Sequence, residues 1–401
     1  MVGLELQVAG AVAGALTMYL GVKRYQSGCG VQLVAGSEPS ASFQAQCGSA
    51  NMRSLLETHV GGLLSDQMVP TPWLPSGMLQ TVYCTMIGLK TDRATRVEYR
   101  RELLTMADGG TVSIDWYNEG RDRAALVVPG LGGSSYEYHV RAMARRLGSR
   151  GYTVAVMNHR GSGRTPLTSA RLYNAYDTED LAVVVHHVAG QPGVRHLVSV
   201  GYSLGANLLT KHLGEAGEDS VVRAGVAICC PFDTAVAGRA LDAPGWLNDH
   251  VFQPNLVATI KRLVRRNLAV FRAAELAYDL DAVMRAKRMS ELDNLVTAPT
   301  YGHKDCWAYY AAASSAPYVR HVRRPLLALN TADDPITPLE GVPLEDAERN
   351  PHVAVALCSH GGHLGLFTGL RPRIWYLDHV ADFLDAALAH ADSECASKDA
   401  C

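Results

Sequence analysis

Apolar runs and segments of helical spacing alternate along the central part of the chain. Buried strands rich in β-branched residues are predicted at 124–128, 152–157, 196–200, 224–228, 325–330 and 353–357. Amphipathic helices are predicted at 138–147, 178–188, 206–213 and 374–388. Strands that alternate with helices predict an α/β fold, with a parallel sheet and right-handed crossovers. Ahead of them, Asp-Gly-Gly at 108–110 lies between two extended segments and predicts a hairpin.

The alternation stops between 231 and 299, where helical patterns dominate and predict an inserted lid. A helix at 255–271 has an apolar face, and its other face carries four basic residues: Lys261, Arg262, Arg265 and Arg266. Two interpretations of this basic face stay open. It is either the solvated side of a surface helix or a lid surface that contacts anionic lipid.

Residues 4–22 form a nearly uninterrupted apolar segment, followed by Lys23 and Arg24. Nineteen helical residues extend about 28 Å, enough for a thin bilayer. No basic residue precedes the segment, which disfavours a cleaved signal peptide. A core helix and an interfacial segment are the alternatives, but we expect 1–26 to be a transmembrane signal-anchor of a single-pass membrane protein. The positive-inside rule would leave the bulk of the chain in the cytosol.

The next stretch, 27–69, is expected to be a linker and N-terminal extension, because 27–50 is rich in Ser, Gly, Ala and Gln. Three prolines and a tryptophan within 70–81 indicate a loop fixed against the domain. The main domain is expected over 70–390, and 391–401 is expected to be a C-terminal tail.

Composition excludes some classes of protein. The chain has 401 residues, 48% of them hydrophobic, so it can bury a large core. A formal net charge of −2 offers no electrostatic basis for binding nucleic acid. The nine cysteines are scattered without Cys-x-x-Cys spacing, which favours reduced thiols over a disulfide framework.

Gly-Tyr-Ser-Leu-Gly at 201–205 follows a predicted strand and precedes a predicted helix. This context is typical of a nucleophile elbow, in which a sharp turn exposes a serine hydroxyl at the head of a helix. The helix N-terminus favours negative charge that develops nearby. Ser203 is therefore the candidate nucleophile.

A serine nucleophile needs a base and an orienting acid, which in this type of fold follow in the order Ser, Asp, His. The strand at 325–330 leads into adjacent aspartates, and we choose Asp334 over Asp333 because Pro335 fixes the turn directly after it. After the last strand, His363 is chosen over His360 because glycines surround it. The two histidines lack a third metal ligand at a suitable spacing, so no metal site is expected.

Backbone N–H groups should stabilise the developing oxyanion. The candidates are the N–H of Leu204, directly after the serine, and that of Leu131 in the glycine-rich loop at 129–133. A dinucleotide loop is the rival interpretation of these glycines. It is disfavoured because Ser135 replaces the third glycine and the next strand is not followed by an acid, so no cofactor is expected.

Six motifs occur in an order that resembles the YheT-like branch of the α/β-hydrolase-fold proteins, which includes membrane-anchored animal members. They are Trp-Leu-Pro-Ser-Gly-Met-Leu-Gln-Thr at 73–81, Pro-Gly-Leu-Gly-Gly-Ser at 129–134, Asn-His-Arg-Gly-Ser-Gly at 158–163, Gly-Tyr-Ser-Leu-Gly-Ala-Asn at 201–207, Ala-Asp-Asp-Pro at 332–335 and Gly-Gly-His-Leu-Gly at 361–365. The resemblance covers 70–390. It implies an α/β-hydrolase fold with a helical lid, and matches Ser203, Asp334 and His363 to the family's nucleophile, acid and base.

The family includes carboxylesterases, acylglycerol lipases and phospholipases, many with an N-terminal signal-anchor. Its members are often described with the catalytic domain on the non-cytosolic side, opposite to the charge-based expectation. We therefore expect a membrane-tethered serine hydrolase that cleaves carboxylic esters, with a lipid or small ester as substrate. Acyl transfer by the same triad and a non-catalytic ligand-binding protein are the alternatives. Oligomeric state is not predicted.

Overall fold

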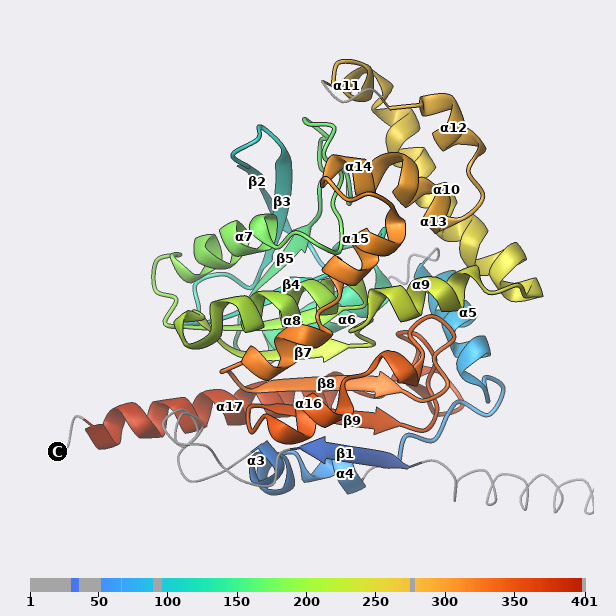
Figure 1. Cartoon of the computed structure of the whole chain (residues 1–401). Coiled ribbons are helices and arrows are strands. Elements are labelled where there is room, and N and C mark those ends of the chain that lie inside the picture. Colours follow the sequence, from blue (N-terminus) through green and yellow to red (C-terminus); the bar gives the residue numbers. More distant parts are fainter. Residues whose placement is uncertain (1–29, 36–51, 66, 89–95, 275–277, 399–401) are drawn as a thin grey trace, which may run out of the picture.

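The computed structural model describes residues 30–35, 52–65, 67–88, 96–274 and 278–398. Its centre is a nine-stranded sheet with helices on both faces (Figure 1). The strand order is β1-β9-β8-β7-β6-β4-β5-β3-β2. The strands are β1 (Val31–Ala35), β2 (Arg100–Thr105), β3 (Thr111–Tyr117), β4 (Arg123–Val128), β5 (Thr153–Asn158), β6 (His196–Tyr202), β7 (Val222–Ile228), β8 (Leu326–Thr331) and β9 (Val353–Cys358).

The six strands from β5 to β9 in this order are parallel, as the sequence predicts. The predicted hairpin is present as β2 and β3, which add antiparallel strands at one side of the sheet. At the other side, β1 pairs antiparallel with β9. The parallel strands end together at what we call the carboxyl edge of the sheet. Because β4 lies between β5 and β6, the chain reverses direction across the sheet there, and such reversal points are where α/β folds bind ligands.

The strands have apolar side chains on both sides, and helices cover both faces of the sheet. In β4, Ala125 and Val127 belong to the apolar cluster on one face, and Ala124, Leu126 and Val128 to the cluster on the other. The first face is covered by α3 (Met52–His59), α6 (Tyr138–Ser149) and α17 (Leu377–Lys398). The second is covered by α7 (Glu179–Ala189), α8 (Leu204–Ala216) and α16 (Leu344–Arg349).

The segment between β7 and β8 is helical, as its apolar spacing predicts, and forms the layer at the upper right of Figure 1. Its helices are α9 (Thr234–Asp242), α10 (Gln253–Arg266), α11 (Leu268–Arg272), α12 (Leu280–Arg285), α13 (Met289–Leu292), α14 (Ala298–Thr300) and α15 (Cys306–Ala313), with π-helical turns at Asn248–Phe252 and Asp293–Thr297. Its apolar side chains pack on Leu167, Leu172 and Tyr173 of the loop after β5.

Three features differ from the expectations: the presence of β1 and both ends of α17. Strand β1 lies inside the expected linker at 27–50, because it adds to the exposed side of β9, a pairing that composition does not reveal. The expected helix at 374–388 begins later, at Leu377, because residue 374 belongs to a small hairpin of β10 (Phe367–Thr368) and β11 (Arg373–Ile374). The same helix continues to Lys398, through part of the expected tail.

The expected anchor at 1–26 lies outside the described residues. Among the helices of the described part, none combines the length and the apolarity needed to cross a bilayer. Five further elements lie before β2 or between strands: α4 (Gly61–Ser65), α5 (Gly77–Gly88), and short 3-10 turns at Gly217–Asp219, Ala316–His321 and Leu339–Gly341. Helix α5 reaches the carboxyl edge.

Candidate active site

Ser203 lies between β6 and α8, in the strand–serine–helix context that the sequence predicts. Its backbone has φ 50° and ψ −117°, a conformation that L-residues rarely adopt. The cost is of the order of 1–3 kcal/mol and must be met by the surrounding contacts. The Ser203 N–H donates to the Ile228 carbonyl at 2.9 Å, which ties the turn to β7.

Close backbone packing explains the two glycines of the motif. A Cβ added to Gly201 would lie 2.5 Å from the Gly205 carbonyl oxygen. One added to Gly205 would lie 2.2 Å from the carbonyl oxygen of Val128, at the end of β4. Any side chain at either position would therefore push apart the strand and helix that hold Ser203.

Ser203, His363 and Asp334 come together at the carboxyl edge of the sheet. The Ser203 Oγ lies 2.8 Å from His363 Nε2, and His363 Nδ1 lies 2.8 Å from Asp334 Oδ2. Both distances are within hydrogen-bond range, so the serine hydroxyl can donate to Nε2 while Nδ1–H donates to the carboxylate. This arrangement fixes the imidazole in the tautomer that a general base requires.

The Asp334 carboxylate is fully buried and its other lone pairs are satisfied. Its Oδ1 accepts the N–H groups of Ile336 (2.7 Å) and Thr337 (2.9 Å), and its Oδ2 accepts the Thr337 hydroxyl (2.6 Å). These donors hold the carboxylate toward His363 and stabilise its charge out of water.

The rival pair, Asp333 and His360, forms a separate contact at 3.3 Å. Asp333 also accepts the N–H of Gly77 (2.7 Å) and that of Gly362 (2.9 Å). Adjacent aspartates thus point in different directions. Asp334 faces the serine side of the loop, and Asp333 fastens α5 to the loop that carries His363.

The glycine-rich loop after β4 lies directly against the serine, since a Cβ on Gly130 would be 3.1 Å from the Ser203 Cβ. Two stacked rings hold this loop: His159 Nε2–H donates to the Pro129 carbonyl at 3.0 Å, and the Tyr173 hydroxyl accepts the Gly132 N–H at 2.9 Å. This loop carries Leu131, one of the two expected oxyanion donors.

The other expected donor, the Leu204 N–H, belongs to the first residue of α8. The first N–H groups of a helix have no acceptor within the helix. They also lie at the positive end of its dipole, where negative charge is stabilised. The position of Leu204 directly after the serine therefore suits an oxyanion.

Four hydrogen bonds from distant parts of the chain hold the loop of His363. The Thr81 hydroxyl of α5 accepts the His363 N–H at 2.8 Å, and the Thr331 hydroxyl donates to the Gly362 carbonyl at 3.0 Å. The Cys229 sulfur accepts the Leu364 N–H at 3.2 Å and donates to the Gly362 carbonyl at 3.7 Å. The Cys229 side chain thus contacts the backbone of the residue before His363 and of the residue after it.

Sequence reasoning missed the parts played by Cys229 and Thr81. Cys229 directly follows β7, next to the strand that ends in Ser203, so its place at the carboxyl edge was a usable signal. Thr81 is the last residue of the first motif quoted above, but no local pattern links α5 to a loop nearly 300 residues later. That contact exists only in the folded chain.

Burial keeps two side chains beside the candidate triad, those of Cys229 and His139, uncharged. Complete burial and the nearby Asp334 raise the pKa of the Cys229 thiol well above its ordinary value, so it stays protonated. Burial, with a smaller effect of His363, lowers the pKa of His139 to about 4, so this ring is neutral at pH 7. A positive charge that forms on His363 therefore meets no second cation there.

Within the described residues, the Cys229, Asp334 and His363 side chains form a group whose ligand atoms lie within 4.8 Å of one another. A metal would require the cysteine as thiolate, which the raised pKa opposes. The same histidine and aspartate atoms are already engaged with each other at 2.8 Å. The donor set fits a hydrogen-bonded triad better than a metal site.

The lid helix α10 packs on the loops beside Ser203. A Cβ on Gly132 would lie 2.6 Å from Thr259, and one on Gly161 would lie 2.3 Å from Leu263. The other face of α10 presents Arg262, Arg265 and Arg266 to solvent. This agrees with a solvated surface helix, and contact with lipid remains a prediction.

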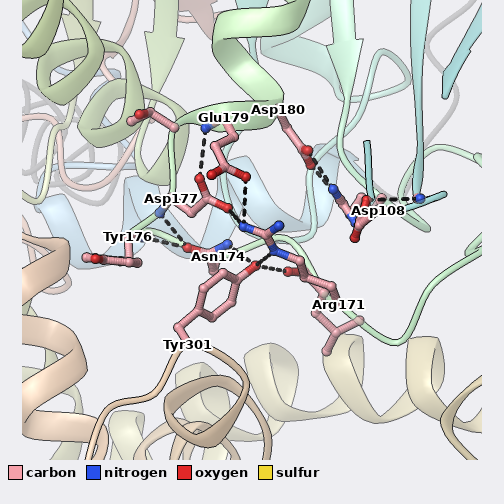
Figure 2. A network of polar contacts seen from close by, with 12 residues as sticks. Asp108, Arg171, Asn174, Tyr176, Asp177, Glu179, Asp180 and Tyr301 are labelled. Carbon is pink, nitrogen blue, oxygen red and sulfur yellow. Dashed lines mark hydrogen bonds and ion pairs between the residues drawn. The ribbon is translucent and has the colours of Figure 1, made fainter. Parts of the chain in front are cut away.

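A polar network ties the far end of the lid to the body of the protein (Figure 2). The Tyr301 hydroxyl accepts from Arg171 (3.1 Å) and Asn174 (2.6 Å), and donates to the Leu172 carbonyl at 3.0 Å. Arg171 also pairs with Asp177. The lid is thus fastened just after α14, close to the loop on which its apolar side chains pack.

We expect separate substitution of each adjacent aspartate by asparagine to distinguish their roles. Asp334→Asn should lower kcat on a soluble short-chain ester about a thousandfold or more, because the amide cannot orient and stabilise the charged imidazole. Asp333→Asn should lower kcat by about tenfold, because it loosens the loop without removing the partner of His363. Equal losses, or the reverse order, would contradict the assignment.

Replacement of Cys229 should impair turnover rather than substrate binding. Cys229→Ala leaves the part-buried Leu364 N–H unpaired and should lower kcat by about tenfold with little change in KM. Cys229→Ser, which can still accept and donate, should recover most of the loss. The matched control is Cys230→Ala, which removes an equally buried thiol that contacts Ser315 instead. A similar fall in kcat for Cys230→Ala would show a general packing effect.

Comparison with known proteins agrees with this geometry. A family model described as "alpha/beta hydrolase fold" matches residues 125–370. Human "Phospholipase ABHD3" is 30% identical over 387 residues, covering 91% of this chain and 92% of the relative. The "Putative esterase YheT" of Escherichia coli is 29% identical and covers 71% of this chain and 84% of the relative.

Two further proteins extend the comparison. The "Monoacylglycerol lipase" of Saccharomyces cerevisiae is 28% identical and covers 65% of this chain and 58% of the relative. The solved structure of the Pyrococcus furiosus esterase Pf2001 has a TM-score of 0.50 at 17% identity, covers 75% of this chain and 94% of that one, and shows a similarity of fold alone. With the family match and the first relative together, the chain belongs to the α/β-hydrolase-fold family, in its YheT-like branch.

Proposed function

We propose that this protein is a membrane-tethered serine hydrolase that cleaves carboxylic esters of lipids through an acyl-enzyme on Ser203. The observation that carries the proposal is the pair of 2.8 Å contacts that link Ser203 to His363 and His363 to Asp334. Relatives named phospholipase, monoacylglycerol lipase and esterase support ester hydrolysis.

In the first half-reaction, the Ser203 Oγ attacks the acyl carbonyl and His363 Nε2 takes the hydroxyl proton. Asp334 stabilises the imidazolium that forms. The N–H groups of Leu131 and Leu204 donate to the oxyanion of the tetrahedral intermediate. When the intermediate collapses, His363 returns its proton to the leaving alcohol and the acyl group remains on the serine.

In the second half-reaction, water takes the place of the alcohol. His363 removes a proton from the water as it attacks the acyl-enzyme, and the same oxyanion donors stabilise the second intermediate. When this intermediate collapses, the bond between the acyl carbon and the Ser203 Oγ breaks, His363 returns the proton to that oxygen, and the carboxylic acid leaves. An acceptor other than water would make the protein an acyltransferase by the same steps.

A lipid substrate is supported by the apolar surroundings of the site. Leu131 is half-buried and packs against the lid cluster that contains Val257, Ile260 and Val264. An acyl chain that lies along these side chains would be shielded from water, which favours long-chain over short-chain esters.

The central test uses a fluorophosphonate probe, which forms a covalent bond with activated serines. We expect the full-length protein to be labelled and Ser203→Ala to remain unlabelled, with loss of measurable hydrolysis. Reaction in 18O-labelled water should place one labelled oxygen in the released acid. Labelling without incorporation of 18O would favour acyl transfer, and absence of labelling would favour a non-catalytic ligand-binding protein.

Membrane tethering is proposed from residues 4–22, which are apolar and long enough to span a thin bilayer. A chain that begins at residue 26 keeps β1 but lacks this segment. It should be released by alkaline carbonate, whereas the full-length protein should stay in the membrane fraction. The truncated form should retain its kcat on a soluble ester within about twofold, because every proposed catalytic group lies after residue 130. Retention of the truncated form in the membrane would contradict a single anchor.

A further inference from the structure

Three large apolar side chains are exposed together near the carboxyl edge of the sheet. Trp73 is 51% exposed, Leu79 45% and Leu370 79%. We call these three residues the docking patch. Isolated exposed apolar residues are common on protein surfaces, so what matters is whether the three lie side by side.

Contacts between their segments show that they do. The Trp73 indole N–H donates to the Leu370 carbonyl at 3.0 Å. Trp73 also packs edge-on against Tyr83, with ring centroids 5.1 Å apart. Tyr83 lies four residues after Leu79 in α5, so both side chains project from the same face of that helix. The patch therefore extends from Leu370 across Trp73 to Leu79.

The docking patch is connected directly to the loop of the candidate base. In α5, the Gln80 side chain accepts the Phe367 N–H at 2.7 Å, which fastens the helix to the β10–β11 hairpin. The next residue, Thr81, accepts the His363 N–H. Leu370 lies in the turn of that hairpin, seven residues after His363. A surface that contacts the patch therefore lies beside the active site.

The hairpin also carries positive charge. Arg371 and Arg373 follow the exposed Leu370 closely in sequence and are exposed themselves, and neither has an acidic partner among the described residues. A tryptophan and a leucine beside guanidinium groups suit the boundary between lipid acyl chains and anionic headgroups.

The described chain begins at this same edge. Gly30 exchanges hydrogen bonds with Ser359, only four residues before His363, and Val31 pairs with Cys358 at the end of β9. In Figure 1, β1 starts on the side toward which β8 and β9 point, and α5 lies on that side as well. Seven residues lie between Gly30 and the end of the apolar segment at 4–22, and the eight steps from residue 22 to Gly30 can span at most about 29 Å.

We propose that the docking patch contacts the surface of the membrane that holds residues 4–22, with Arg371 and Arg373 against anionic headgroups. The inference rests on the proposed function as a membrane-tethered hydrolase. The short connection keeps the carboxyl edge close to the bilayer, and the docking patch orients it so that the active site faces the lipid. A lipid substrate then reaches Ser203 from the bilayer without crossing bulk water.

The test compares two substrates for the full-length protein reconstituted in vesicles of phosphatidylcholine and phosphatidylserine. One is a long-chain lipid ester in the bilayer, and the other is a short-chain ester in solution. Leu370→Glu should lower the ratio of bilayer to soluble activity by about tenfold, because a charge replaces an inserted leucine. The matched control is Leu103→Glu on β2, a leucine 53% exposed at the opposite side of the sheet, which should leave the ratio unchanged.

The basic residues provide a second arm. Arg371→Gln combined with Arg373→Gln should lower the ratio in vesicles that contain phosphatidylserine, and have little effect in phosphatidylcholine alone. A readout independent of activity is quenching of tryptophan fluorescence by brominated lipid. Quenching should be stronger in the unaltered protein than in the Trp73→Phe variant, because Trp73 would lie at the depth of the headgroups.

The outcomes separate this inference from the proposed function. If the unaltered protein hydrolysed neither ester, the proposed hydrolase function would be wrong, whereas quenching of tryptophan fluorescence would still report docking. An unchanged activity ratio in Leu370→Glu, together with equal quenching in Trp73→Phe, would overturn docking while leaving hydrolysis intact. A change of oligomeric state in Leu370→Glu, with the ratio unchanged, would overturn it in favour of a contact between two copies of the chain.

Discussion

The imidazole of His363 can contact both Ser203 and Asp334 only while its loop keeps one position. Side chains from other parts of the chain hold that loop almost entirely. Gly361, Gly362 and Leu364 all have positive φ, so the loop has no regular structure of its own. Its backbone polar groups are satisfied by Thr81, Thr331, Cys229 and Asp333 instead. The placement of the base therefore depends on buried hydrogen bonds between segments that fold far apart in sequence.

The sheet provides the rigid frame for these contacts. Because β4 and β6 are neighbours in parallel register, the loop after β4 and the turn after β6 meet at one edge. The loop that carries Leu131 and the turn that carries Leu204 thereby lie against each other. Helix α10 then packs on this edge through Thr259 and Leu263, and its arginine face is exposed. The candidate triad, helix α10 and the exposed side chains of the docking patch thus lie at one end of the molecule.

Much of this could be predicted from the sequence, for local reasons. Continuous apolar runs separated by helical patterns are enough to predict a parallel sheet, since strands buried on both faces have no polar alternation. Gly-Tyr-Ser-Leu-Gly at 201–205 combines a strand, a sharp turn and a helix within a few residues, so its geometry is a local property. The acid and the base each follow a strand, and parallel strands end at the same edge. That is why Asp334 and His363 could be singled out as candidates.

Tertiary structure decided what local sequence cannot encode. Pro335 favoured Asp334 over Asp333, but both follow the same strand, and the folded structure shows that Asp334 contacts His363 while Asp333 contacts His360. The contacts of Cys229 and Thr81 with the loop of His363 join positions more than a hundred residues apart. The five residues of β1, Val-Gln-Leu-Val-Ala, lie in a stretch rich in Ser and Gly, and what stabilises them as a strand is pairing with β9. Sequence alone determined which chemistry the chain carries, whereas packing across the sheet decided which atoms meet.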